Sequence, residues 1–184
     1  QERITKVADE IAAQMGAERI GTCEIQDTGR PFYGVYYGQA ALPHAPERLF
    51  YLDNAVIRGL QVYNVETQSD IPVYDLGAAA GRDPYEMFLG GARSIIKITN
   101  PNAAQERRLI VFRDSFGSSI APLLAAGYSE ITLVDIRYIS PLSLGKLIDF
   151  TKADDVLFLY SAAVINNSET IKDRTGFSAW GCGC

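Results

Sequence analysis

One stretch in the second half of the chain decides the fold, and it reads Leu109-Ile110-Val111-Phe112-Arg113-Asp114-Ser115-Phe116-Gly117-Ser118-Ser119. The apolar run at 109–112 is typical of a strand that is buried on both faces of a parallel sheet. The polar and small residues after it favour a tight turn, because Asp and Ser readily cap the start of a helix. A helix-prone segment follows over 120–126. The stretch therefore predicts a buried strand that turns directly into a helix.

The segments on either side extend this pattern. Apolar runs predict three more strands and a second helix: the strands lie at 94–98, 131–134 and 156–160, and the helix lies at 142–150. Parallel strands that alternate with helices are joined by right-handed crossovers. The expected fold class is therefore α/β, a three-layer sandwich with a mainly parallel sheet and a strand–helix–strand–helix–strand core within 94–161.

The first half of the chain has a different character. Apolar residues recur along one face of a predicted helix over 4–15, and they are Ile4, Val7, Ala8, Ile11, Ala12 and Met15. Residues 20–76 are rich in Tyr, Phe, Val and Ile broken by Gly, Pro, Asn and Asp. This composition predicts an irregular β-rich insertion, with short strands at 49–52, 59–63 and 71–74. We expect one domain over 1–172, followed by a tail over 173–184.

Composition excludes several classes of protein. The chain has 184 residues, of which 47% are hydrophobic and 21% charged, as is typical of one soluble globular domain. With 22 acidic and 17 basic residues, its net charge is −5, so no broad basic surface for nucleic acid is expected. No apolar run is long enough to predict a transmembrane helix. The cysteines and the single histidine lack the spacing of metal ligands, and the sequence has no glycine motif for binding nucleotides. Neither a metal nor another cofactor is therefore expected.

Polar residues follow the predicted strands, at the edge where open α/β sheets bind their ligands. Asp114 and Ser115 come directly after the first buried strand, flanked by Arg113 and Gly117. A serine hydroxyl at this place lies near a helix N-terminus, where backbone N–H groups favour an oxyanion. Asp and Ser are also the residues that cap helices. Nucleophile and helix cap are both open interpretations, and Arg113 and Gly117 are candidate oxyanion or cleft residues.

Two further pairs are cleft candidates. Asp135 and Arg137 follow the strand at 131–134, where they either line the cleft or form a salt bridge that fixes the loop. Gly90 and Gly91 precede the strand at 94–98, where they either offer a backbone N–H to an anion or simply form a turn.

The aromatic segment over 32–38 contains the candidate substrate contacts. Tyr36 and Tyr37 either stack on sugar rings or pack against the rest of the domain. The single histidine, His44, lies between two prolines on an expected extended loop.

Several segments together, in their order and spacing, resemble the DHHW protein family of bacteria. They are 32–38, 83–91, 98–101, 109–119, 134–138 and 155–161. The resemblance runs from near residue 1 to about residue 172. The family is similar to the alginate O-acetyltransferase proteins and looks like a branch of the SGNH-hydrolase superfamily. The resemblance therefore implies a flavodoxin-like three-layer sandwich.

The resemblance also implies roles for residues. Asp114 and Ser115 match the Gly-Asp-Ser block that carries the serine nucleophile, with Arg113 in place of the glycine. The family's Asp-His pair lies in the upstream Asp-His-His-Trp motif, which this sequence lacks. The chain is then expected to be the C-terminal portion of such a protein. Because a serine needs a histidine and a carboxylate for activation, it is expected to be inactive alone.

The implied function is that of an acyl esterase or O-acetyltransferase acting on cell-surface carbohydrate. Expected partners are a carbohydrate or acylated cell-surface polymer and a membrane-bound O-acyltransferase. The expected location is extracytoplasmic, either secreted or anchored by an N-terminal segment that is not in this chain. The alternative is a non-catalytic carbohydrate-binding or scaffold protein of the cell envelope, since fold does not fix function.

Overall fold

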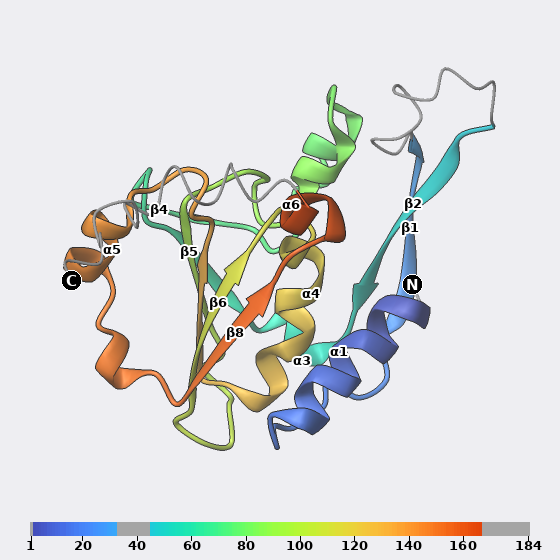
Figure 1. Ribbon diagram of the computed structural model, residues 1–184. Helices are drawn as coiled ribbons and strands as arrows, with labels where there is room; N and C mark the ends of the chain where they lie inside the picture. Colours follow the sequence, from blue (N-terminus) through green and yellow to red (C-terminus); the bar gives the residue numbers. More distant parts are fainter. Residues whose placement is uncertain (1, 33–44, 167–184) are drawn as a thin grey trace.

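A computed structural model describes residues 2–32 and 45–166 (Figure 1). The helices and strands in chain order are α1 (Glu2–Gln14), β1 (Glu24–Phe32), β2 (Glu47–Asp53), α3 (Ala55–Arg58), β3 (Gln61–Asn64), β4 (Ser69–Ile71), η1 (Ala78–Ala80), η2 (Pro84–Met87), β5 (Ile95–Thr99), β6 (Arg108–Arg113), α4 (Gly117–Leu124), η3 (Ala125–Gly127), β7 (Glu130–Val134), α5 (Pro141–Leu147), η4 (Phe150–Lys152), β8 (Asp155–Leu159) and α6 (Ala162–Asn166). Within these ranges, no helix combines the length and the apolar character needed to cross a bilayer.

The main sheet has six strands in the order β4-β3-β5-β7-β6-β8. β6 runs parallel to β7 and β8, as the alternation of strands and helices predicted. The other pairings, β3 with β4, β3 with β5 and β5 with β7, are antiparallel. The sheet is therefore mixed, which corrects the expectation of a mainly parallel one. Residues 100–107 join β5 to β6 without a helix, so they cannot return the chain for a parallel strand.

Apolar residues of β6 pack on both faces of the sheet. Leu109 and Val111 belong to a buried cluster that includes residues of α1 and α4. Ile110 belongs to a second cluster on the opposite face, with Leu144 of α5. This second face is less completely covered, because Val156 and Phe158 of β8 remain 49% and 68% exposed. Helices thus lie on both faces, but the described residues do not complete the expected three-layer sandwich.

The β-rich insertion contains a small sheet of its own. β1 and β2 form an antiparallel pair, separate from the six-stranded sheet, and in Figure 1 they extend beside α1. β2 and β3 overlap the strands predicted at 49–52 and 59–63. The strand predicted at 71–74 is instead β4 at Ser69–Ile71, because its pairing with β3 ends at Ile71. Tyr36, Tyr37 and His44 lie outside the described residues, as does the tail over 173–184.

Candidate functional site

The buried carboxylate of Asp114 holds the turn after β6 through hydrogen bonds. Its Oδ1 accepts a hydrogen bond from the Phe116 N–H (3.0 Å), and its Oδ2 accepts one from the Ser161 N–H (2.8 Å). Ser161 directly follows β8 and its neighbour Tyr160, so Asp114 joins the ends of two parallel strands. The side chain is 2% exposed. Asp114 therefore holds the strand-to-helix turn in place from both sides.

Ser115 lies exposed at the tip of this turn. Among the described residues, neither its hydroxyl nor its backbone N–H has a hydrogen-bond partner, while its carbonyl accepts from the Ser118 N–H (3.1 Å). The N-cap of α4 is Phe116, and no side chain caps it. The serine hydroxyl is thus free for other contacts, and its role as a nucleophile stays a prediction.

Arg113 and Gly117 pack against one another beneath the turn. Arg113 is fully buried; its Nη1 donates to the Asp114 carbonyl (3.3 Å) and its Nη2 to the Arg93 carbonyl (3.5 Å). Burial lowers the pKa of the Arg113 guanidinium, although the nearby Asp135 carboxylate opposes this shift. The Gly117 N–H already donates to the Asp114 carbonyl (3.1 Å). Gly117 therefore offers close packing for Arg113 rather than a free N–H.

Asp135 and Arg137 form the salt bridge that was one of their two interpretations. The Asp135 carboxylate is fully buried and accepts from Arg137 Nε (2.9 Å) and Nη2 (2.7 Å). These hydrogen bonds raise the pKa of Arg137. The Asp135 N–H donates to the Ser94 carbonyl (2.8 Å), which holds the end of β7 against the start of β5. The pair fixes this loop, and a further role in a cleft is untested.

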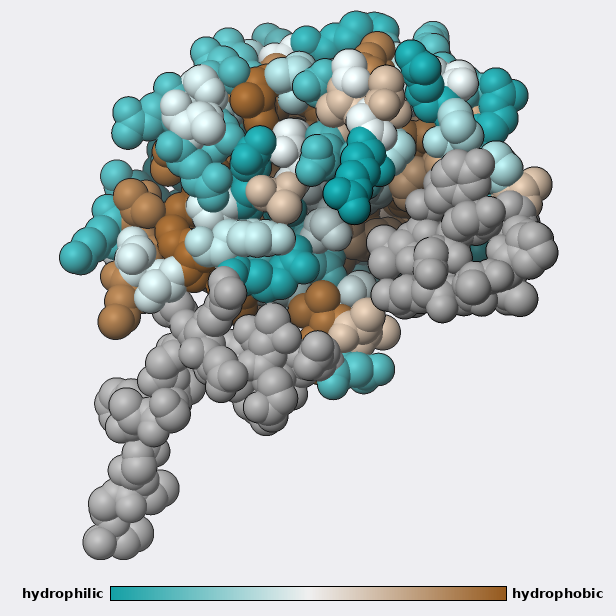
Figure 2. Space-filling view, turned by 90° about the horizontal axis from the view of Figure 1, so that it is seen from above, coloured by the Kyte–Doolittle hydropathy of each residue, from teal (hydrophilic) through white to brown (hydrophobic). Residues whose placement is uncertain are grey.

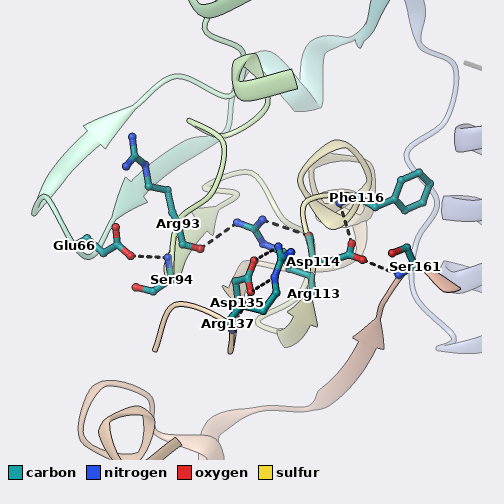
Figure 3. A network of polar contacts seen from close by, with 9 residues as sticks. All are labelled: Glu66, Arg93, Ser94, Arg113, Asp114, Phe116, Asp135, Arg137 and Ser161. Atoms are coloured by element: carbon teal, nitrogen blue, oxygen red, sulfur yellow. Dashed lines mark hydrogen bonds and ion pairs between the residues drawn. The ribbon is translucent and has the colours of Figure 1, made fainter. Parts of the chain in front are cut away.

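The antiparallel direction of β5 brings a segment to the site that the sequence did not reveal. Because β5 begins where β6 and β7 end, Arg93 and Ser94 join the network in Figure 3. Ser94 donates its N–H to Glu66 Oε1 (2.6 Å). No spacing signal could have found these residues, since strand direction depends on pairing across the sheet.

Gly90 and Gly91 precede this segment in a tight turn. Both have positive φ angles, +69° and +78°. The Gly91 N–H donates to the Phe88 carbonyl (3.1 Å), and a Cβ at Gly91 would lie 2.9 Å from Cγ of Glu86. The turn interpretation therefore accounts for Gly91, and anion binding by Gly90 stays a prediction.

Comparison with known proteins shows which structures share this fold. No family model and no curated protein matches the chain. A crystal structure of a DHHW family protein from Eubacterium siraeum DSM 15702 matches with a TM-score of 0.67 and 22% identity, over 94% of this chain and 60% of that chain. The fold is DHHW-like. At this identity the likeness establishes the fold alone.

Structures of Bacillus cereus PatB1 share the DHHW-like fold. One, with a sulfonyl adduct, has a TM-score of 0.64 and covers 88% of this chain and 56% of that chain. The other has a TM-score of 0.62 and covers 88% and 57%, and both are 20% identical to this chain. The present chain therefore spans less than two thirds of each of these proteins.

Tyr160, at the end of β8 in this DHHW-like fold, yields a prediction about alkaline stability. Its hydroxyl is buried without a partner among the described residues. Burial, followed by the charges of Asp135 and Asp114, raises the pKa of Tyr160 to about 12. An unfolded tyrosine ionises at about pH 10. Between these values the unfolded chain loses a proton that the folded chain keeps, so stability falls as the pH rises.

We expect Tyr160→Phe to leave the free energy of unfolding at pH 8 unchanged or higher, because it removes an unpaired hydroxyl. We also expect it to make the decrease between pH 8 and pH 11.5 smaller. Urea unfolding at both pH values measures these effects. Tyr128→Phe is the contrast: the Tyr128 hydroxyl donates to Asp155 Oδ2 (2.9 Å). The loss of this hydrogen bond to a carboxylate should cost about 1.5–3 kcal/mol at pH 8. An equal loss in Tyr160→Phe would contradict the unpaired state of its hydroxyl.

Proposed function

We propose that this chain carries the serine nucleophile of an SGNH-type acyl esterase or O-acetyltransferase that acts on cell-surface carbohydrate. The observation that carries the proposal is the exposed Ser115 hydroxyl, without a partner among the described residues, on the turn that Asp114 fastens. The α/β sheet is then the central layer of a flavodoxin-like sandwich. The DHHW-like fold and the sulfonyl adduct in Bacillus cereus PatB1 support this proposal.

The proposed chemistry is acyl transfer through a covalent serine ester. Ser115 Oγ attacks the ester carbonyl carbon, its proton passes to a general base, and the alcohol leaves with that proton. The free Ser115 N–H donates to the developing oxyanion. No described residue lies within hydrogen-bond distance of Ser115 Oγ to act as the base. We propose that an Asp-His pair from polypeptide outside the described residues takes this role, as in the family that the sequence resembles.

The substrate and location in this proposal follow the family that the sequence resembles. The serine ester then passes its acyl group to water in an esterase, or to a hydroxyl of a carbohydrate or cell-surface polymer in a transferase, and the released Ser115 oxygen regains a proton from the base. The reaction is placed outside the cytoplasm in this proposal, with a membrane-bound O-acyltransferase as the partner. Outside the atoms drawn in grey, the face seen from above in Figure 2 is mainly hydrophilic, with separate apolar groups among the hydrophilic ones. Such a surface suits a polar substrate.

A sulfonyl fluoride tests Ser115 as the nucleophile, with imidazole in solution acting as the general base. Ser115 Oγ bonds to sulfur, the S–F bond breaks, fluoride leaves, and imidazole accepts the hydroxyl proton. We expect one phenylmethanesulfonyl adduct by intact mass, formed faster as imidazole increases, and none in Ser115→Ala. Ser140→Ala is the matched control, because Ser140 is also exposed at a helix start without a capping hydrogen bond.

Equal labelling of Ser115→Ala and the unaltered chain would contradict the role of Ser115 as the nucleophile. A carbohydrate-binding protein is the second candidate function, favoured by the lack of a described base beside Ser115. That candidate predicts no adduct at any imidazole concentration, together with sugar binding that survives Ser115→Ala.

A further inference from the structure

The peptide group between Asp114 and Ser115 is asymmetric in its hydrogen bonds. Its carbonyl oxygen accepts from Arg113 Nη1 (3.3 Å) and from the Gly117 N–H (3.1 Å). Its N–H, which belongs to Ser115, has no partner among the described residues. One side of this amide is therefore saturated by donors, one of them charged, while the other side is free beside the exposed Ser115 hydroxyl.

The charge on Arg113 is not cancelled by a carboxylate in direct contact. Within the described residues no ion pair to Arg113 is formed, and the Asp135 carboxylate already accepts three hydrogen bonds from Arg137, one from its backbone N–H and two from its side chain. The oxygens of Asp114 are occupied by backbone N–H groups. Figure 3 shows the Arg113 guanidinium between the carbonyl groups of Arg93 and Asp114, so it donates to backbone dipoles instead.

A buried charged donor polarises the amide that accepts it. Hydrogen bonds strengthen one another in series, and charge-assisted ones are about twice as strong as neutral ones. Withdrawal of electrons toward the Asp114 carbonyl oxygen leaves more positive charge on the Ser115 N–H. The low dielectric around a fully buried guanidinium preserves this effect, because little water screens it.

We infer that Arg113 is a positioning residue that strengthens the Ser115 N–H as a hydrogen-bond donor to the oxyanion. The inference rests on the proposed function and adds a role for the residue that replaces glycine in the nucleophile block. Arg113 does not touch the substrate. It acts through the Asp114–Ser115 peptide group, and Gly117 leaves the space in which its side chain packs.

Nuclear magnetic resonance of the Ser115 amide tests this inference independently of any reaction. Arg113→Met keeps most of the side-chain length and removes the charge, and Arg113→Lys keeps the charge without the guanidinium. We expect the Ser115 ¹⁵N resonance to move upfield in Arg113→Met and by a smaller amount in Arg113→Lys. Arg108→Met is the matched control, since Arg108 is exposed at the opposite end of β6.

The rate of sulfonyl labelling at a fixed imidazole concentration is the second readout. Arg113→Met keeps the Ser115 N–H and removes only its polarisation, and one hydrogen bond strengthens the next by about 10–30%, so labelling should slow by roughly two- to fourfold. Arg113→Lys should recover part of the rate, which a purely structural role would not produce. If Arg113→Met does not fold, the Ser115 amide resonance of Arg113→Lys, compared with that of the unaltered chain, tests the inference alone.

The outcomes separate this inference from the proposed function. An unchanged Ser115 amide resonance in folded Arg113→Met or Arg113→Lys overturns the inference, even if Ser115 is labelled. Absence of labelling in the unaltered chain counts against the proposed function, while an upfield shift in the variants still supports polarisation by Arg113. Equal shifts in Arg108→Met would also overturn it, because the effect would not come from the buried guanidinium.

Discussion

Replacing Asp114 by alanine should lower the free energy of unfolding by about 3 kcal/mol, because two backbone N–H donors lose a buried, charged acceptor. The donors are the N–H groups of Phe116 and Ser161, at 3.0 and 2.8 Å. The turn would also lose its link to the end of β8, so Ser115 should no longer be labelled by the sulfonyl fluoride. Urea unfolding and intact mass measure the two effects.

Asp149→Ala is the control for this prediction. Asp149 also accepts a hydrogen bond from the N–H two residues ahead (Thr151, 3.1 Å), together with local contacts from the Thr151 hydroxyl (2.6 Å) and the Lys152 ammonium (3.5 Å). It is exposed, however, and accepts no hydrogen bond from a second strand. Its replacement should destabilise the protein far less. Comparable losses in the two variants would show that the bond from Ser161 contributes nothing and that Asp114 is only a local turn residue.

Gly117→Ala should destabilise the protein by about 2–3 kcal/mol, at the upper end for overpacking in a core. The new Cβ would lie 2.6 Å from Cβ of Arg113 and 3.1 Å from its Cγ. Cβ of Arg113 is fixed to the backbone of β6, so it cannot rotate away, and the strand or the helix must shift. The free energy of unfolding in urea is the measurement.

Gly145→Ala should have the opposite sign. A Cβ at Gly145 meets nothing within 4 Å, and the residue is exposed in α5. Alanine should therefore stabilise the protein by about 0.5–1 kcal/mol through its helix propensity. In addition, Gly117→Ala should cost less in an Arg113→Gly background than in the unaltered chain. Additive effects would contradict the contact between the two residues.

The elements around the site could be predicted because their signals are local. Apolar runs and their spacing predicted β6, β7 and β8 with the helices between them, and the residues after β6 predicted its turn. Side-chain burial imposes these periods on any sequence of this kind, whatever the rest of the chain does. The sequence could likewise restrict Asp114 and Ser115 to two roles, cap or nucleophile, because few residue types suit a strand-to-helix turn.

The apolar runs did not reveal that β5 is antiparallel to its neighbours. A run such as 95–99 is equally suited to parallel and antiparallel pairing, and its direction was decided by the short connection after it. This direction brought Arg93 and Ser94 to the site, where no motif had placed them.

By itself, the sequence determined the identity of the strands, the turn at Asp114 and Ser115, and the resemblance that suggested a nucleophile. Only the tertiary structure decided which atoms are free. In the folded chain, the oxygens of Asp114 accept hydrogen bonds from Phe116 and Ser161, and the carboxylate of Asp135 accepts from Arg137. The hydroxyl and N–H of Ser115 have no partner among the described residues. The physical reason is that local periodicity sets which faces are buried, whereas hydrogen-bond partners depend on segments that meet only when the sheet assembles.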